Sequence, residues 1–336
     1  MKEVIKMKKS IKFSAIILAL IIMAISVFSG CGNGEQAAKK IGIIQFMPHS
    51  SLDNCCQGIK NILDKNNIAY EVQIGSSTSP TEDCQSYAAR MASDGQYDMI
   101  IAIATPAATA AYSAVRNASS DIPVIFCAVS DPVAAKLVES TDKPGNNCTG
   151  TSDAFDIPSQ VKMIKAFQPD LAKLGVIYTT TEPNSLSQLE TLKSEAAKFG
   201  IEIVEKGIND ATELPTVTAN LLPEVQAVTN LTDNNVVENM STLLEQANTA
   251  GIPVYGSEIE QVKKGCIAAA SLDYVALGEK TAEMALGVRS ENNAAQTPVL
   301  VITDSTPVIN TQVMAKFNIT LPEAYNNAEK VTAETA

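Results

Sequence analysis

The chain has 336 residues and is acidic, with 37 Asp and Glu against 25 Lys and Arg and a formal net charge of −12. Its length suits one large or two medium α/β domains. The acidic balance argues against nucleic acid as a partner, because no cluster of basic side chains is left to follow a phosphate backbone once the N-terminal segment is removed.

Signatures of enzymes are missing from the sequence. The only histidine is His49, so a histidine-dependent triad or a multi-histidine metal site would rest on it alone. Phosphate-loop, dinucleotide-binding, esterase-elbow and zinc-protease motifs are also missing. We therefore expect no enzyme activity, no cofactor and no metal.

The N-terminus carries an export signal. Five Lys precede an apolar run over residues 13–28, which ends in Ser29-Gly30-Cys31. That run is shorter than the roughly 20 residues of a spanning helix, and small residues before a Cys are typical of lipoprotein cleavage sites. The pattern predicts a signal peptide over 1–30, a lipidated Cys31 and a tether over 31–40. The alternative is a retained membrane helix.

Cleavage there leaves a protein anchored by lipid to the outer face of the plasma membrane. Residues 1–30 hold five Lys and one Glu, so their removal takes the net charge from −12 to −16.

From residue 40 onward, short apolar strands alternate with amphipathic helices. Strands are expected at 40–46, 69–75, 98–104 and 122–129, and helices at 52–66, 81–93 and 107–116. Nearly continuous apolar strands separated by helices are typical of a parallel sheet covered on both faces.

The pattern restarts after residues 145–156. Helices are expected at 158–167, 185–199, 214–221, 235–250, 259–264 and 274–289, with strands at 174–180, 201–207, 224–231, 252–257, 266–273 and 298–303. This predicts an α/β fold of two doubly wound parallel-sheet lobes with a ligand cleft between them, at the carboxyl ends of the strands.

The chain is expected to cross between the lobes more than once. The N-terminal lobe is predicted at 41–154 plus 274–300, and the C-terminal lobe at 155–273 plus 301–330. Hinges are expected at the crossings near 153–157, 271–274 and 303–306, where a few loop dihedrals can absorb a rotation.

Six cysteines follow Cys31 without the paired spacing of a metal site. Cys127 lies in an apolar strand pattern and is expected to be a small buried hydrophobe. Cys55 and Cys84, on neighbouring helices, are a possible disulfide in an exported protein.

Polar residues recur where apolar strands give way to helices: Thr105-Pro106, Ser130-Asp131-Pro132, Asn184-Ser185 and Thr232-Asp233-Asn234. Free N–H groups at helix N-termini suit a ligand carboxylate, and an adjacent Asp suits an ammonium. The alternative is ordinary N-capping, which favours the same residue types. The placement on both expected lobes favours a site for a small zwitterion.

Seven stretches, taken in order, resemble one family: IGIIQFMPHSSLD, IAIATPAATAA, IPVIFCAVSDPVAAKLV, GNNCTGTSD, LGVIYTTTEPNSLSQLETLK, NLTDNNVV and IPVYGSEIEQVKKGCIAAASLDYVALGEKTA. The chain resembles the ABC-transporter substrate-binding proteins of the tryptophan/tyrosine type, a branch of the type I periplasmic-binding fold. The resemblance covers nearly the whole chain after residue 40.

The resemblance implies two lobes that close over an amino acid, typically aromatic, and deliver it to a permease with its ATPase. It places sixteen residues at the ligand: Gln45, Phe46, His49, Thr105, Pro106, Ser130, Asp131, Ser152, Asp153, Asn184, Ser185, Thr232, Asp233, Asn234, Glu258 and Asp273. Pro48 departs from the acidic residue that is common before this histidine, which affects the expected polar contact of the first lobe.

Roles are expected for some of these side chains. Asp273 or Asp233 is expected to hold the ligand ammonium, and the alternative for either residue is a structural cap or a hinge bond. The expected carboxylate ligands are Thr105, Ser185 and Asn234. An aromatic ligand side chain is expected to pack between aliphatic walls and Phe46 or Tyr178. The absence of Trp favours an amino acid over a sugar, since sugar sites stack pyranose faces on aromatic rings.

Two other functions stay open from the sequence. The same domain can serve as a surface receptor that presents its ligand to a sensor protein. An exported enzyme on this scaffold is the less favoured reading, with Asp153, Asp233 or Cys56 as acid or nucleophile. The protein is expected to be a monomer.

Overall fold

The computed structural model describes residues 39–291, 293–303 and 305–332. The predicted signal peptide, Cys31 and most of the tether lie outside these residues. No helix among them combines the length and the apolar character needed to cross a membrane.

The first sheet has six strands in the order β11-β5-β4-β3-β1-β2, all parallel. Its strands are β1 (Lys40–Gln45), β2 (Tyr70–Ile74), β3 (Tyr97–Ile103), β4 (Val124–Cys127), β5 (Cys148–Ser152) and β11 (Leu300–Val301). Ile43 pairs with Val72 on one side and with Ile101 on the other. Because the chain winds from β1 outward to β2 and then back to β3, a topological switch point lies between β1 and β3.

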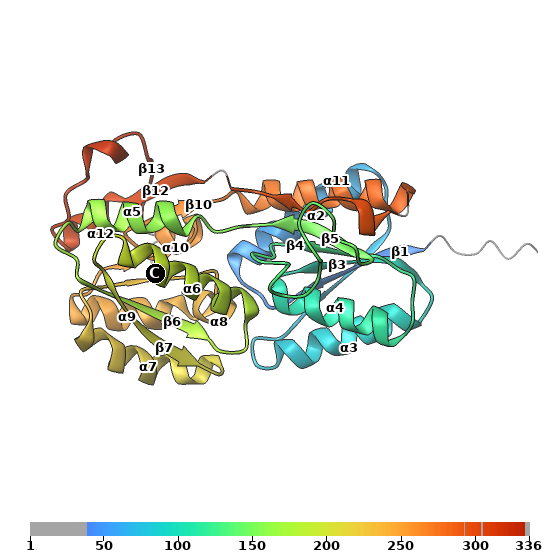
Figure 1. The fold of residues 1–336 in the computed structure, drawn as a ribbon, viewed down its shortest axis with the longest axis horizontal. Helices are drawn as coiled ribbons and strands as arrows, with labels where there is room; N and C mark the ends of the chain where they lie inside the picture. The colour runs from blue at the N-terminus through green and yellow to red at the C-terminus, as the bar shows by residue number, and fades with distance from the viewer. Residues whose placement is uncertain (1–38, 292, 304, 333–336) are drawn as a thin grey trace, which may run out of the picture. The chain divides into compact units, whose positions relative to one another are not determined.

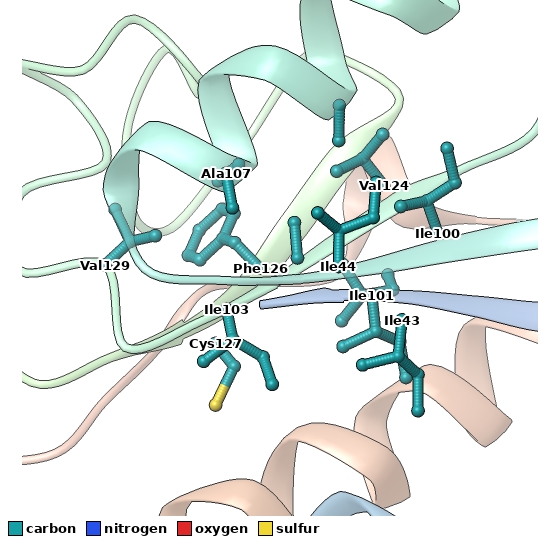
Figure 2. Close-up of a cluster of buried hydrophobic side chains, with 14 of the residues drawn as sticks. Ile43, Ile44, Ile100, Ile101, Ile103, Ala107, Val124, Phe126, Cys127 and Val129 are labelled. Carbon is teal, nitrogen blue, oxygen red and sulfur yellow. The ribbon is translucent and has the colours of Figure 1, made fainter. Parts of the chain in front are cut away.

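Helices cover both faces of this sheet. They are α2 (Ser50–Lys65), α3 (Pro80–Ser93), α4 (Thr105–Asn117) and α11 (Tyr274–Glu291). Figure 1 shows α2 and α11 on one face, with α3 and α4 on the other. Strand side chains alternate between the two helical layers: Figure 2 shows Phe126 directed to one side and Cys127 to the other, both fully buried. The expectation for Cys127 is confirmed.

The winding reversal at β1 also separates the expected cysteine pair. Cys55 lies on α2 and Cys84 on α3, two helices that cover opposite faces of the sheet (Figure 1), and both cysteines are free. The Cys84 thiol instead contacts the Gln45 and Phe46 carbonyl oxygens at 3.8 Å. The Cys55–Cys84 disulfide was therefore wrong.

A second parallel sheet has the order β7-β6-β8-β9, and a third has the order β10-β12-β13. Their strands are β6 (Lys173–Thr179), β7 (Glu202–Ile208), β8 (Ala227–Thr229), β9 (Val254–Tyr255), β10 (Ala268–Ser271), β12 (Thr306–Asn310) and β13 (Glu329–Val331). The second sheet repeats the reversal, with its switch point between β6 and β8. In the third sheet β10 runs antiparallel to β12. The parallel α/β prediction is confirmed, while the separate small sheet was not expected.

The helices of this half are α5 (Ile157–Phe167), α6 (Pro183–Ala197), α7 (Leu214–Leu221), α8 (Asn234–Glu238), α9 (Met240–Ala250), α10 (Ile259–Lys264) and α12 (Thr311–Lys316). Short 3-10 turns are η1 (Ala211–Glu213), η2 (Leu222–Glu224), η3 (Ala294–Gln296) and η4 (Glu323–Tyr325). The helix expected at 235–250 is two helices, because the backbone leaves the helical range at Asn239 (φ −99°, ψ 23°).

Strand β5 was missed because its sequence, CTGTS, is polar. Its hydroxyls are buried and paired: Thr149 donates to the Thr297 carbonyl at 2.7 Å, and Thr151 bonds the Thr281 hydroxyl at 2.7 Å. Buried polar groups are tolerated when they find such partners. Segments 153–156, 272–273 and 302–305 connect elements of the first sheet with elements of the other two. The lobe boundaries and the hinges stay predictions.

Close packing of α2 on α11 depends on two glycines. A Cβ on Gly278 would overlap the Cys55 carbonyl oxygen, and one on Gly58 would overlap the Val275 carbonyl oxygen. We expect Gly278→Ala to cost about 1–3 kcal/mol through overpacking and to lower Tm by several degrees. Gly287→Ala on the same helix meets no atom within 4 Å, and is expected to be neutral or to stabilise by about 0.5–1 kcal/mol. Calorimetry of both variants tests this; equal Tm values would contradict it.

Candidate functional site

A cavity lies at the carboxyl ends of strands from both parallel sheets. It is lined by His49, Ser51, Leu52, Ala104, Thr105, Ala128, Ser130, Asp153, Asn184, Thr232, Asn234, Val237, Ser257, Glu258, Gln261 and Tyr274. These residues follow β1, β3, β4 and β5 of the first sheet, and β6, β8, β9 and β10 toward the other side. Both switch points therefore border the cavity, the place where open α/β sheets bind ligands.

Half of the sixteen expected ligand residues line this cavity. They are His49, Thr105, Ser130, Asp153, Asn184, Thr232, Asn234 and Glu258. The other eight lie outside its lining: Gln45, Phe46, Pro106, Asp131, Ser152, Ser185, Asp233 and Asp273. For each of these eight residues, a hydrogen-bond partner within the protein or a position elsewhere in the fold explains why it does not line the cavity.

Neither of the two expected ammonium ligands faces the cavity. The Asp233 carboxylate is fully buried and accepts from the Thr179 backbone N–H and hydroxyl, the Ser185 hydroxyl and the Val236 backbone N–H, at 2.6–3.1 Å. Asp273 is exposed, and its carboxylate caps α11 by accepting from the Ala276 backbone N–H at 3.0 Å. Asp233 thus organises the loop after β6, and Asp273 is an ordinary helix cap.

Three other residues that were expected to contact the ligand form hydrogen bonds within the protein instead. The Gln45 amide donates to the Met47 carbonyl and to Asp53. Ser185 donates to Asp233 at 2.7 Å, so its hydroxyl is not free for a ligand carboxylate. The Ser152 hydroxyl donates to the Ser130 carbonyl at 3.1 Å.

Neither of the two aromatic residues that were expected to pack against the ligand side chain, Phe46 and Tyr178, lines the cavity. Phe46 and Pro106 line a separate groove between α3, α4 and the loops after β6 and β7. Tyr178 packs against the core of the second half. The phenol ring in the cavity lining is that of Tyr274, and the larger aliphatic lining residues are Leu52 and Val237.

Hydrogen bonds join the two sides across the cavity. His49 Nε2 lies 3.1 Å from Asn234 Oδ1, and the Ser130 hydroxyl lies 3.1 Å from the Thr232 hydroxyl. At the rim, Ser187 donates to Asp131 at 2.6 Å. Asp131 therefore bridges the two sides without lining the cavity.

The cavity lining contains two buried carboxyl groups and no Lys or Arg. Asp153 is 3% exposed and accepts from the Ser130 and Tyr274 hydroxyls at 3.0 and 3.1 Å. Burial raises its pKa to about 6, against the lowering effect of these hydrogen bonds. Glu258 is 2% exposed and accepts from the Glu260 and Gln261 backbone N–H groups at the start of α10; burial raises its pKa to about 7. A ligand cation would stabilise the ionised carboxylates.

Three helices of eleven residues or more begin at the cavity without a side-chain cap. They are α2, α4 and α6, whose N-cap residues are His49, Ala104 and Glu182. By contrast, the N-terminus of α5 is capped by Asp156. Uncapped first-turn N–H groups and the helix dipole favour an anion, so the lining offers positions for a carboxylate as well as for an ammonium.

Two residues of the cavity lining have a strained backbone conformation. Ala104 (φ 81°) and Ala128 (φ 55°), at the ends of β3 and β4, are non-glycine residues in the left-handed region, and both line the cavity. Such conformations cost free energy and are concentrated at functional sites. Here they turn the chain from each strand toward the cavity.

Several lining side chains carry a buried polar atom with no partner. They are His49 Nδ1, Ser51 Oγ and Asn184 Oδ1. Burial also lowers the pKa of His49 to about 4, so its ring is neutral at physiological pH. Buried polar atoms in native proteins are nearly always paired, so these three indicate positions for ligand hydrogen bonds.

Sequence reasoning missed half of the lining, including the polar residues Ser51, Ser257, Gln261 and Tyr274, and it missed Glu182 directly behind the lining. Glu182 stands between the end of β6 and Pro183, the position type at which other site residues were sought. It could have been singled out by that criterion. Tyr274 carried no signal, because an aromatic residue at a helix start reads as core. The described residues contain no group of three or more His, Cys, Asp or Glu that could hold a metal ion.

A family model for ABC transporter substrate binding proteins matches residues 40–332. The chain belongs to this family. Its members are extracytoplasmic solute-binding components of ABC transporters, and the family is not one of enzymes. The type I periplasmic-binding fold and the tryptophan/tyrosine type expected from the sequence are confirmed.

Individual relatives cover most of the chain. A tyrosine-binding protein of Clostridioides difficile (strain R20291) is 36% identical over 323 residues, which is 90% of this chain and 91% of that protein. The crystal structure of an ABC domain from Streptococcus pneumonia in complex with L-Trp matches with a TM-score of 0.81 at 30% identity, covering 87% of this chain and all of that one.

A third relative differs in conformation. The ligand-free, open structure of a substrate-binding protein with adhesive properties from Clostridium difficile is 34% identical and covers 88% of this chain and 100% of its own, but its TM-score is 0.65. The present structure therefore superposes better on the L-Trp complex than on this open form, although the open form is more similar in sequence.

Proposed function

We propose that this solute-binding protein captures an aromatic L-amino acid and delivers it to an ABC permease. The observation that carries the proposal is a cavity whose described lining residues include two buried carboxyl groups and no Lys or Arg, with three uncapped helix N-termini beside it. Two relatives support the same ligand class: one is named a tyrosine-binding protein, and the structure of the other is a complex with L-Trp.

In this proposal Asp153 takes the ligand ammonium, in place of Asp273 or Asp233. Its two oxygens each accept one hydroxyl and retain capacity for further donors. Glu258 contributes negative charge, but both of its oxygens already accept backbone N–H groups. The ligand carboxylate is placed at the N-termini of α2 and α4, near Ser51 and Thr105. Leu52, Val237 and Tyr274 offer an apolar wall for the ligand side chain.

Capture is proposed to proceed by closure of two lobes, 41–154 with 274–300 and 155–273 with 301–330. A ligand that contacts both lobes favours the closed form only through contacts that the open form lacks. In this proposal the hydrogen bonds His49–Asn234 and Asp131–Ser187, which join the two lobes, form on closure.

The proposal also includes the membrane anchor. Cleavage before Cys31 and its lipidation would hold the protein, as a monomer, at the outer face of the plasma membrane. Mass spectrometry of the N-terminal peptide from membranes tests this, and an unmodified Met1 or Cys31 would contradict it.

Thermal shift tests the ligand class. L-Trp, L-Tyr or L-Phe at about 100 times its Kd is expected to raise Tm by roughly 5 °C or more through linkage to the folded state. Ribose, adenosine and a dipeptide serve as controls and are expected to give no shift. A shift with only a sugar or nucleoside would overturn the amino-acid assignment.

A further inference from the structure

Glu182 lies behind the cavity wall and collects three N–H donors on one oxygen. Its side chain is 2% exposed and comes directly before Pro183 at the start of α6. Oε2 accepts from the Asn234 side-chain amide at 2.6 Å, the Asn184 side-chain amide at 3.1 Å and the Asn234 backbone N–H at 3.2 Å. Oε1 is buried without a partner. Two of these donors belong to side chains that line the cavity.

The bond to Glu182 determines which way the Asn234 amide faces. Its nitrogen lies at the Glu182 oxygen, so its oxygen Oδ1 lies 3.1 Å from His49 Nε2. The reverse orientation would place two oxygens 2.6 Å apart, which is repulsive. Asn234 Oδ1 is an acceptor, so His49 Nε2 must carry the hydrogen, and neutral His49 then has Nδ1 as an acceptor.

Asn184 is oriented by the same carboxyl group. Its nitrogen donates to Glu182 Oε2 and to the Thr232 carbonyl oxygen at 3.0 Å. A flipped amide would set its oxygen against both of these acceptors. Asn184 Oδ1 is consequently left facing away from them, buried and without a partner.

We propose that Glu182 is a positioning residue that sets the hydrogen-bond polarity of the cavity. It turns both amides so that His49 Nδ1 and Asn184 Oδ1 are offered as acceptors, alongside the carboxylate of Asp153. Three acceptors match the three N–H groups of a primary ammonium. This inference rests on the proposed function, and it assigns selection for the ligand's amino group to a residue that does not line the cavity.

The protonation of Glu182 does not alter this geometry. Burial, followed by the nearby charge of Asp233, raises its pKa to about 8. Any proton belongs on Oε1, since Oε2 already accepts three N–H groups. The His49 ring, whose pKa lies at about 4, stays neutral while Glu182 titrates.

The single histidine makes the first test independent of any variant. In protein with ¹⁵N-labelled histidine and no polyhistidine tag, long-range ¹H–¹⁵N correlations at pH 7 are expected to show one ring in the Nε2–H tautomer. An Nδ1–H tautomer or an imidazolium would overturn the inference, because His49 would then offer no acceptor at Nδ1.

The second test measures selectivity with L-Trp and its deaminated analogue, indole-3-propionate, by calorimetric titration. Wild type is expected to prefer L-Trp by at least about 100-fold. In Glu182→Met, which removes the acceptor at similar length, that preference is expected to fall at least tenfold, and the His49 spectrum is expected to show mixed tautomers. Glu182→Gln retains an acceptor at the Oε2 position and is expected to keep the preference within about threefold.

Glu190→Gln, an exposed carboxyl on the same helix, is the matched control and is expected to behave as wild type. If wild type binds no amino acid, the proposed function fails. If wild type binds L-Trp and Glu182→Met keeps the full preference, only the positioning role fails. Should Glu182→Met not fold, two other results decide: an Nδ1–H tautomer in wild type, or loss of the preference in Glu182→Gln, would each overturn the inference.

Discussion

Asp153→Asn is expected to abolish binding of L-amino acids, with a loss of affinity of about 100-fold or more. The substitution preserves the shape of the side chain and removes its charge. A ligand ammonium would then be buried in the cavity without its counter-ion, and breaking a buried ion pair costs about 3–5 kcal/mol, which corresponds to roughly two to four powers of ten in Kd. Of the Ser130 and Tyr274 hydroxyls, which donate to different Asp153 oxygens, one keeps its acceptor in the Asn oxygen, and the other can rotate to accept from the Asn amide, so the fold is expected to persist.

Calorimetric titration of Asp153→Asn and Asp273→Ala distinguishes the ammonium ligand proposed from the structure from the one expected from the sequence. Asp273 is exposed and serves only as a helix cap, so its substitution is expected to lower stability by about 1 kcal/mol and to leave Kd within about twofold. If Asp273→Ala abolishes binding while Asp153→Asn binds normally, the assignment made from the sequence is right and the structural one is wrong.

Ligand affinity is expected to fall about tenfold as pH is lowered from 7.5 to 5. The pKa of Asp153 in the free protein is about 6, whereas the ammonium of the ligand requires its ionised form. Below that pKa a proton must be released on binding, and each pH unit then costs about a factor of ten in Kd. An affinity independent of pH in wild type would contradict an ion pair at this carboxyl.

The stability of the ligand-free protein is expected to follow the opposite trend. Asp153, Glu258 and Glu182 have pKa values of about 6, 7 and 8, all raised by burial. The stability they contribute is present in full below the unfolded values near 4, and is lost as pH rises through the folded values. The free energy of unfolding should therefore increase as pH falls from 8.5 to 6.5.

Below pH 6.5 the contribution of His49 has the opposite sign. Its pKa is lowered to about 4, so the stability it contributes is present above its ordinary value of 6.5 and is lost as pH falls through 4. Urea denaturation between pH 6.5 and 8.5 separates these effects. Glu182→Gln combined with Glu258→Gln should flatten the slope there, and an unchanged slope would show that these two carboxyls do not titrate in this range.

The sequence by itself determined the winding of both parallel sheets and the edge at which the site lies. Apolar runs such as the one around Ile43 must be buried on both faces, which requires helices on both sides of the sheet. Polar residues at the ends of those runs, among them Thr105, Asn184 and Asn234, then fall at the carboxyl ends of the strands. Eight of them meet at the cavity because the topology brings those ends together.

Only the tertiary structure decided which carboxyl groups serve the ligand and which serve the fold. Asp153 and Asp233 follow strands in similar ways, and one-dimensional spacing does not distinguish them. Asp233 is surrounded by four N–H and O–H donors from β6, α6 and α8, whereas Asp153 has two hydroxyl partners and lines the cavity. The position of Glu182 could have been singled out from the sequence, but its role could not, because that role depends on Asn234, 52 residues away in the chain, and on His49 beyond it. Hydrogen-bond partners of this kind are set by packing between distant elements, which local sequence does not encode.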